Sequence, residues 1–255
     1  MLTWLKQAMK DAIGPTHPGH LIRWYHVMPK VRSGCRGTVR VLDGGCGNGI
    51  AVMHLAARYP HAHFVGADIQ DMCYNQSRAA TCGLTNVSFE QCDLSCECPR
   101  GPFDIIFSVD VMEHVEDPQR MLQLLSSELQ PDGQLIFHVP CRSRRNVLKA
   151  TRLVDERIGE LMEHRCDGFT QSDLHTMVRN ADLKIVSMRN TFARWVGGLA
   201  WEISTLAQRC AWCDNELGAL LKPYVMATAL AEAYLGIGRC WPGRGILLVA
   251  ERAVE

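Results

Sequence analysis

The sequence predicts an α/β protein with a doubly wound, mostly parallel sheet and a helical insertion before the last strand. Two observations lead to this prediction. Between residues 38 and 139, short apolar runs alternate with helical patterns, as they do in βαβ units. After residue 189, this rhythm gives way to a long helical stretch, which ends in one final apolar run.

The first half of the chain holds five strands and the helices between them. The strand at 103–108 is mostly apolar, as expected for a strand buried on both faces. The helix after it has a clear start, because the capping carboxylate of Asp117 precedes a proline at the first helical position. In order, the expected elements are strands at 39–42, 63–67, 86–91, 103–108 and 134–139, with helices at 49–59, 71–83 and 117–129.

The second half holds two further strands. Thr170 and Asp173 form a capping box for a helix over 171–180, and a strand follows at 183–188. The last strand is expected at 245–251. Some 55 residues between these strands look helical and hold four of the six tryptophans, Trp195, Trp201, Trp212 and Trp241.

Charge and composition exclude several classes of protein. The 27 basic and 27 acidic side chains cancel, so the bulk charge favours neither nucleic acid nor an anionic membrane as a partner. With only 21% charged residues, the chain is not a disordered tail. The 12 cysteines are scattered, which indicates free thiols in a reducing compartment. Since we find neither a signal peptide nor a membrane-spanning stretch, we expect a cytoplasmic protein without stable membrane insertion.

The strongest functional signal lies where the first strand turns into its helix, in the segment VLDGGCGNG at 41–49. Glycines at alternate positions let the backbone turn tightly and let a ligand come close, and the helix N-terminus beyond adds exposed N–H groups. The glycines concerned are Gly45, Gly47 and Gly49.

Acidic residues accompany this turn. Asp43 ends the first strand, Asp68 ends the second, and Asp93 follows the third. The carboxyl ends of parallel strands meet at one edge of a sheet, so the three acids define one crevice. A carboxylate placed like Asp68, nineteen residues after the last glycine, can accept hydrogen bonds from both hydroxyls of a ribose.

This set, D-x-G-x-G-x-G followed by two acids, resembles the class I S-adenosylmethionine-dependent methyltransferases, in their small-molecule type 11 branch. The segments 103–115 and 129–135 look like the fourth and fifth motifs of that family. The resemblance spans about residues 38 to 190. It implies a Rossmann-like sheet with an antiparallel last strand, with S-adenosyl-L-methionine as cofactor and S-adenosyl-L-homocysteine as product. The alternative is a Rossmann-like domain that binds another nucleotide.

The resemblance implies a role for each motif position. Asp43 and the glycine turn would hold the methionine part of the cofactor. Asp68 would accept from the ribose hydroxyls, and Asp93 from the adenine amino group. Further contacts would come from Ile69 on the adenine, Leu94 beside it, and Ser108 and Val109 near the sulfonium.

Three histidines are candidates for a base that removes a proton from a hydroxyl acceptor: His114, His138 and His164. For His114 the other interpretation is a loop-structuring or cofactor-lining role, and for His138 a hydrogen-bonded core residue. The run Asp110-x-x-Glu113-His114 also resembles the Glu-x-x-Glu-His of ubiquinone-pathway O-methyltransferases, where those side chains are associated with a divalent metal. Asp replaces the first Glu in this chain, so a divalent metal is possible but is not the expectation.

Two further clusters have less specific interpretations. A basic cluster follows the fifth strand and suits either an anionic group on the acceptor or a solvated loop; it consists of Arg142, Arg144, Arg145 and Lys149. Two cysteine groups suggest zinc, although neither supplies four ligands; they are Cys92, Cys96 and Cys98, and Cys210 and Cys213.

We expect a single domain over 1–255. Its expected parts are a helical extension (1–37), a cofactor-binding core (38–140), an acceptor-side segment (141–188), a helical insertion or lid (189–244) and the last strand (245–255). The insertion is the main departure from the family pattern. It would select a bulky, apolar or aromatic acceptor as a lid; extra core packing, a homodimer contact or a membrane surface are alternatives.

The expected function is methyl transfer from S-adenosylmethionine to a small, hydrophobic molecule, such as one from secondary metabolism. Oxygen is favoured as the methylated atom, with nitrogen or carbon next. Two alternatives remain: a methyltransferase acting on RNA or protein, and a noncatalytic scaffold that binds the cofactor. Zero net charge and the absence of an Asn/Asp-Pro-Pro-Tyr type segment disfavour the first.

Overall fold

The computed structural model describes residues 18–142, 148, 165–209, 216–237 and 242–253. The chain divides into two compact units. The sheet unit comprises 29–140, 165–188 and 247–255, and the helical unit comprises 1–28, 141–164 and 189–246. The single domain expected from the sequence stays a prediction beside this division into units.

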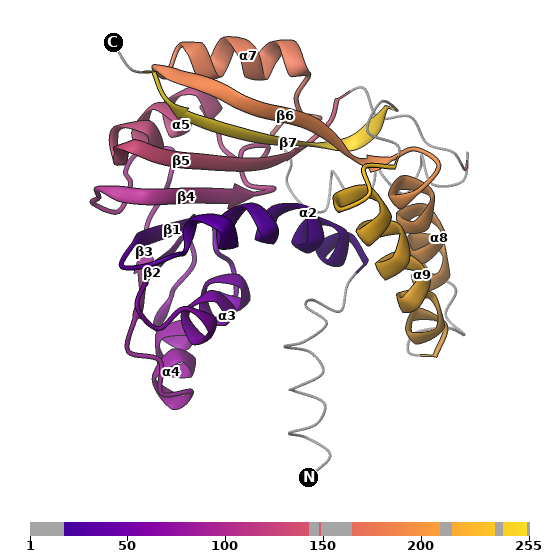
Figure 1. The fold of residues 1–255 in the computed structure, drawn as a ribbon, viewed down its shortest axis with the longest axis horizontal. Helices are drawn as coiled ribbons and strands as arrows, with labels where there is room; N and C mark the ends of the chain where they lie inside the picture. Colours follow the sequence, from indigo (N-terminus) through magenta and orange to yellow (C-terminus); the bar gives the residue numbers. More distant parts are fainter. Residues whose placement is uncertain (1–17, 143–147, 149–164, 210–215, 238–241, 254–255) are drawn as a thin grey trace. The chain divides into compact units, whose positions relative to one another are not determined.

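The sheet has seven strands in the order β3-β2-β1-β4-β5-β7-β6 (Figure 1). β1 pairs in parallel with β2 on one side and β4 on the other, and β2–β3 and β4–β5 are also parallel. The predicted doubly wound, mostly parallel sheet is confirmed, with its antiparallel last strand and the helices before it. The strands are β1 (Arg40–Gly44), β2 (His63–Asp68), β3 (Val87–Gln91), β4 (Phe103–Val109), β5 (Leu129–Pro140), β6 (Leu183–Ala193) and β7 (Gly243–Arg252).

The helices begin where the sequence places capping groups. Asp117 Oδ1 accepts a hydrogen bond from Arg120 N at 2.9 Å, and Pro118 takes the first helical position. Thr170 and Asp173 bond reciprocally, at 3.1 and 2.9 Å, which confirms the capping box. The helices are α2 (Pro18–Gly34), α3 (Ile50–Arg58), α4 (Cys73–Thr81), α5 (Pro118–Ser127), α7 (Gln171–Arg179), α8 (Gly197–Arg209) and α9 (Glu216–Ala233).

Two predicted boundaries are wrong. β5 starts at Leu129 and includes the Pro-Asp-Gly segment that turn chemistry placed in a loop. The pairing with β4 jumps from Phe103↔Leu129 to Ile105↔Gln134, so the extra residues form an irregularity within the strand. The predicted insertion, 189–244, begins and ends in strands instead, because β6 runs to Ala193 and β7 begins at Gly243.

The core of the sheet unit is apolar and centred on β4. This strand lies between β1 and β5, and its side chains from Ile105 to Ser108 are buried, as predicted for a strand covered on both faces. Fully burying a large apolar side chain contributes roughly 1.5–3 kcal/mol. The largest such side chains include Phe64, Phe103, Phe107, Phe137, Leu42 and Ile106.

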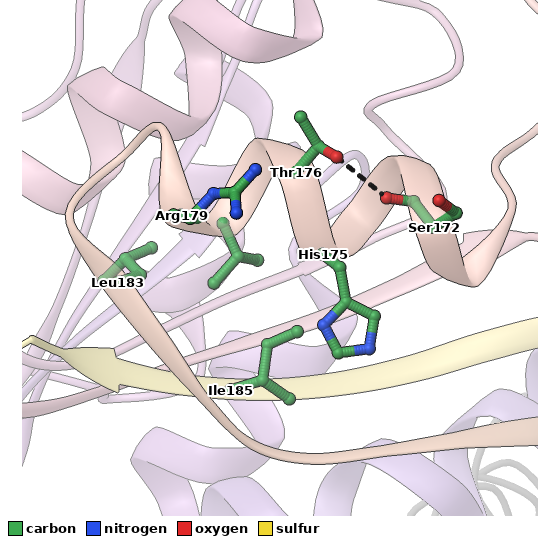
Figure 2. Close-up of a pocket in the computed structure, with 7 residues that line it drawn as sticks. Ser172, His175, Thr176, Arg179, Leu183 and Ile185 are labelled. Atoms are coloured by element: carbon green, nitrogen blue, oxygen red, sulfur yellow. Dashed lines mark hydrogen bonds between the residues drawn. The ribbon is translucent and has the colours of Figure 1, made fainter.

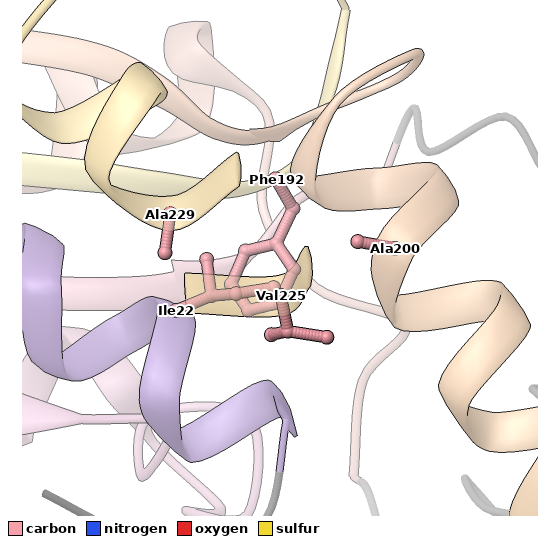
Figure 3. Close-up of a cluster of buried hydrophobic side chains, with 5 residues drawn as sticks. All are labelled: Ile22, Phe192, Ala200, Val225 and Ala229. Carbon is pink, nitrogen blue, oxygen red and sulfur yellow. The ribbon is translucent and has the colours of Figure 1, made fainter. Parts of the chain in front are cut away.

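The helical unit has its own small core. α8 and α9 contact each other, and residues from α2, β6, α8 and α9 meet in one buried cluster (Figure 3). The ring of Phe192 lies between Ile22 and Val225 in this view, with alanines on either side. No helix of the described residues combines the length and hydropathy of a membrane span.

Candidate functional site

The glycine turn closes on the end of β2. Gly45 N and Cys46 N both donate to the carbonyl oxygen of Ala67, at 2.7 and 2.9 Å. Gly45 has φ +82°, and a Cβ there would lie 2.2 Å from Val111 Cγ2. Gly49 is equally confined, with Phe89 2.6 Å from an added Cβ. Packing therefore requires glycine at both positions.

Gly47 differs from its neighbours. It has φ +51°, but a Cβ built there meets nothing within 4 Å. Its N–H donates to Asp68 Oδ2 at 2.7 Å, and its carbonyl accepts from Asn75 Nδ2 at 2.8 Å. The peptide is thus fixed on both sides while the position itself faces open space, as the approach of a ligand requires.

Asp68 ties the turn to β2. Its Oδ2 holds Gly47, and its Oδ1 accepts from Gln70 N at 3.1 Å. An ionised carboxylate has about four lone-pair sites, so two backbone bonds leave room for further donors such as ribose hydroxyls. The sequence does not reveal that this side chain also holds the glycine turn.

Asp43 is 4% exposed, at the end of β1. Burial, and then the nearby charge of Asp68, raises the pKa of Asp43 to about 8. A cation near this carboxyl would lower that pKa again. Such a site fits the positively charged methionine end of the cofactor that the resemblance implies.

A pocket of about 240 Å³ lies at the carboxyl ends of the strands, within the sheet unit. Such strand ends are where doubly wound sheets bind ligands. Ile69 is 63% exposed beside it, an unusual exposure for a large apolar side chain. Six of the predicted residues line this pocket: Gly45, Asp68, Ile69, Asp93, Leu94 and His114.

The hydrogen bonds of Asp93 favour its ionised form, which accepts further hydrogen bonds. Ser95 donates to its Oδ1 from both its N–H, at 2.9 Å, and its hydroxyl. The hydroxyl, followed by the amide, lowers the pKa of Asp93. The carboxylate therefore stays ionised and has acceptor capacity left for an amino group.

The other predicted cofactor residues do not line that pocket. Asp43 lies in β1, and Gly47 and Gly49 lie in the turn that follows it. Ser108 is 1% exposed, and its Oγ has no hydrogen-bond partner among the described residues, while Val109 is half-buried at the end of β4. A buried hydroxyl without a partner costs free energy, so Ser108 Oγ is an unsatisfied polar group near the end of β4.

The three candidate histidines lie in different environments. His114 lines the pocket. His138 is 2% exposed, and its Nδ1 lies 2.7 Å from Asp110 Oδ1, so it is a hydrogen-bonded buried residue. His164 lies outside the described residues.

The Asp110-x-x-Glu113-His114 run does not gather into a metal site. Asp110 turns to His138, Glu113 is 2% exposed, and His114 faces the pocket. Within the part of the chain that the structure describes, no group of three or more His, Cys, Asp or Glu side chains is arranged to hold a metal ion. Of the two cysteine groups, Cys92, Cys96 and Cys98 are free thiols, whereas Cys210 and Cys213 lie outside the described residues.

The basic cluster after β5 is mostly outside the described residues, since only Arg142 of its four members is described, and Arg142 is exposed. Sequence reasoning also missed part of the pocket lining. Arg165 comes from a distant segment, and its N–H donates to Glu113 O at 2.8 Å. No sequence signal places Arg165 there. The other missed lining residues are Cys92, Ser95, Val111, Val115 and Glu116.

A second pocket, of about 450 Å³, lies between α7 and β6 in the sheet unit (Figure 2). In this view His175 points toward Ile185, while Thr176 bonds to the backbone of Ser172. None of the predicted site residues lines it; its lining consists of Ser172, His175, Thr176, Val178, Arg179, Leu183 and Ile185. This pocket is therefore separate from the predicted chemistry.

Buried carboxylates lie inside the helical unit, and the lid hypothesis stays a prediction. Glu232, 3% exposed, accepts from Gly197 N at 2.5 Å and contacts His26 Nε2 at 3.1 Å. Glu202, 0% exposed, accepts from Leu148 N at 2.7 Å and from Arg244 Nη1 at 3.3 Å. Trp195 is 55% exposed, and Arg244 lies 4.2 Å over the ring of Trp201. Trp212 and Trp241 lie outside the described residues.

Comparisons with known proteins agree with this geometry. Residues 16–188 match a family described as "Methyltransferase domain". A trans-aconitate 2-methyltransferase of Azoarcus sp. is 35% identical over 100 residues, which are 39% of this chain and 38% of that relative. The segment matched in another curated relative is 33% of its length, so the chain spans well under half of these relatives.

Two solved structures share the fold. One is a [4+2]-cyclase, SpnF, with a TM-score of 0.61 and 18% identity, covering 93% of this chain and 82% of that one. The other is a sarcosine dimethylglycine methyltransferase, so named provisionally, from Galdieria sulphuraria. Its TM-score is 0.60 at 14% identity, covering 91% of this chain and 85% of that one.

Proposed function

We propose that this chain, which belongs to the class I S-adenosylmethionine-dependent methyltransferases, transfers the methyl group of that cofactor to a small molecule. The observation that carries the proposal is the pocket at the strand ends. There, two ionisable acceptors, Asp68 and Asp93, face the same space as the apolar side chains of Ile69 and Leu94. This combination suits an adenosyl group, whose flat base is apolar on its faces and whose hydroxyls and amino group donate hydrogen bonds.

The residues fit the cofactor part by part. Asp68 would bind the ribose hydroxyls with the lone pairs that Gly47 and Gln70 leave available. Asp93 would accept from the adenine amino group, and Ile69 and Leu94 would pack on the ring. When bound, S-adenosylmethionine supplies a methyl group already activated on a sulfonium.

The methionine end would lie at the glycine turn. The open position of Gly47 leaves room for close approach, and the buried carboxyl of Asp43 complements a positive charge. The Ser108 hydroxyl and Val109 would line the methyl-bearing side. The chain's part in the reaction is then to bind, to orient and to exclude water, which together supply much of the rate for an activated group.

For the acceptor we propose a small, apolar or aromatic molecule methylated on oxygen, in the cytoplasm and in secondary metabolism. The zero net charge and the tryptophans of 189–244 support this choice. The helical unit would contribute to acceptor selection as a lid, and its interior holds buried carboxylates. We also propose that the chain forms a homodimer.

Two alternatives are distinguishable. The structural likeness to a [4+2]-cyclase means that the fold by itself does not imply methyl transfer, so a scaffold or a different chemistry is the first alternative. A methyltransferase acting on RNA or protein is the second, and the balanced charge of 27 basic and 27 acidic residues disfavours it.

The proposal is tested by calorimetry with S-adenosylhomocysteine, followed by transfer of tritium from methyl-labelled cofactor into a small-molecule extract. Asp68→Ala should weaken S-adenosylhomocysteine binding by at least tenfold, because a charge-assisted hydrogen bond to a ligand contributes about 1.5–3 kcal/mol. The matched control is Asp132→Ala, an exposed carboxylate in the irregular part of β5. Absence of binding by the wild type would contradict the proposal, and binding without transfer would favour the scaffold.

A further inference from the structure

We propose that Asp110 is the base that takes the proton of the acceptor, that the buried His138 positions it, and that the acceptor presents a hydroxyl rather than a carboxylate. This inference rests on the proposed methyl transfer. The sequence points to His138 as one candidate base. The geometry favours Asp110 as the base and His138 as the residue that positions it.

Asp110 and His138 are joined by two contacts at the ends of neighbouring strands. His138 Nδ1 lies 2.7 Å from Asp110 Oδ1, and Asp110 N donates to the carbonyl oxygen of His138 at 2.9 Å. The β4–β5 register places Val109 opposite His138, so Asp110 is the first residue beyond the ladder. Because a carboxylate only accepts, the imidazole Nδ1 carries the hydrogen and donates it. Backbone and side chain of Asp110 are thus both fixed by one residue.

Exposure assigns the roles within the pair. The side chain of His138 is 2% exposed, while that of Asp110 is 19% exposed. A base must come within hydrogen-bond reach of the proton it removes, which a fully enclosed imidazole does not. An ionised carboxylate has about four lone-pair sites, so the bond from His138 does not by itself fill the Asp110 carboxylate.

The backbone of Asp110 supports a functional placement. Its φ is +53°, in the left-handed region that few non-glycine residues adopt. Such a conformation persists where the surroundings hold it, and these positions cluster at functional sites. Asp182 has the same kind of φ, +54°, but it follows α7 as an exposed turn residue. Asp182 therefore offers a matched control.

Asp110 lies beside the proposed cofactor pocket. The next residue, Val111, lines that pocket and packs against Gly45, where an added Cβ would meet Val111 Cγ2 at 2.2 Å. β4 lies between β1, which carries the glycine turn, and β5, which carries His138. The buried Ser108 hydroxyl, two residues earlier, adds a polar group without a partner among the described residues. Asp110 itself does not line that pocket, so in this proposal the acceptor would occupy the space next to it, on the β5 side.

The chemistry selects the acceptor class. A hydroxyl must lose its proton as its oxygen bonds to carbon, so it profits from a base. A carboxylate acceptor has no proton to lose, and the negative charge of Asp110 would repel it. In the step we infer, the acceptor O–H bond breaks and its proton passes to Asp110 while a new O–C bond forms to the methyl carbon. The C–S bond breaks, its electron pair stays on sulfur, and the products are a methyl ether and neutral S-adenosylhomocysteine.

The first test follows the chemical form of the transferred label. The wild type is incubated with tritium-methyl-labelled S-adenosylmethionine and either p-cresol, p-toluate or a small-molecule extract. Methyl ethers resist mild alkali, whereas methyl esters release volatile labelled methanol. Alkali-stable label that a cation exchanger does not retain, and that hot hydriodic acid releases as methyl iodide, supports the inference. Alkali-labile label, label retained as an amine, or neutral label that hydriodic acid does not release overturns it, while methyl transfer to a small molecule still stands; absence of S-adenosylhomocysteine binding defeats both.

The second test uses variants. Asp110→Asn should lower kcat for the labelled hydroxyl products by about 10²-fold or more, since general bases contribute typically 10²–10⁴-fold. Its affinity for S-adenosylhomocysteine should change less than twofold, which also reports folding. The control Asp182→Asn should leave both quantities unchanged. An Asp110→Asn protein with wild-type kcat overturns the role of Asp110.

His138 is tested by rescue. His138→Leu removes the donor to Asp110, and His138→Asn restores an N–H near the position of Nδ1. We expect kcat to fall at least tenfold in the leucine variant, with little change in KM, and to recover in the asparagine variant. Equal activity of leucine and wild type, or equal loss in both variants with intact S-adenosylhomocysteine binding, overturns the positioning role.

Discussion

The acidic side chains of the two units find their hydrogen-bond partners at different distances along the chain. Asp68 and Asp93 bond to backbone N–H groups two residues ahead, and Asp68 reaches only 21 residues back to Gly47. In the helical unit, Glu202 meets partners 42 and 54 residues away, and Glu232 meets His26 at a separation of 206. A bond between residues that are close in sequence can be recognised as a sequence motif, whereas a bond between distant residues cannot.

The largest expected effect tests the distant pairs. Glu202→Ala leaves the guanidinium of Arg244, 9% exposed, without its carboxylate, and breaking such a buried pair costs about 3–5 kcal/mol. The free energy of unfolding, from urea titrations followed by tryptophan fluorescence, measures the loss. Glu202→Gln keeps an oxygen for Leu148 N and should lose less. A loss below about 1 kcal/mol in the alanine variant would contradict the importance of the pair.

The glycine turn provides the next test, which separates packing from ligand approach. Gly45→Ala should destabilise the protein by about 2–4 kcal/mol, because a left-handed φ costs about 1–2 kcal/mol and overpacking against Val111 adds 1–3. Gly47→Ala has the same backbone cost without a collision, so its stability loss should be smaller. Its affinity for S-adenosylhomocysteine should fall instead. Equal stability losses in the two variants would refute the distinction.

A smaller effect concerns Asp43. Its pKa is raised to about 8, so in the free protein the carboxyl is mostly protonated at pH 6–7. A cationic ligand group beside it favours ionisation, and binding then releases a proton. Affinity for S-adenosylhomocysteine should rise with pH by up to about tenfold per unit between pH 6 and 8, and flatten above. Calorimetry in buffers of different ionisation enthalpy counts the proton, and Asp43→Asn should abolish the slope.

The smallest expected effect tests a local bond. Asp117→Ala removes the cap of α5 and should cost about 1 kcal/mol in the free energy of unfolding. Asp117→Asn keeps a capping oxygen and should lie within a few tenths of the wild type. Asp117 itself does not line the pocket, so S-adenosylhomocysteine affinity should not change in either variant. A drop in affinity would show that local and distant contacts are coupled.

Much of the sheet unit follows from its sequence. The order of strands and helices, the caps at Asp117 and Thr170, and the grouping of Asp68 with Asp93 all depend on short-range patterns. The prediction fails where a local signal is overridden. The Pro-Asp-Gly segment at 131–133 has turn chemistry, yet pairing with β4 draws it into β5 as an irregularity.

The sequence by itself determined the α/β class, the glycine turn and the acids at the strand ends, because hydrophobic periodicity and turn chemistry act over a few residues. Only the tertiary structure decided that His138 is buried against Asp110, that Arg165 reaches the pocket, and that the helical unit encloses Glu202 and Glu232. Each of these contacts joins residues that are distant along the chain. Periodicity carries no information about such partners, and folding alone brings them together.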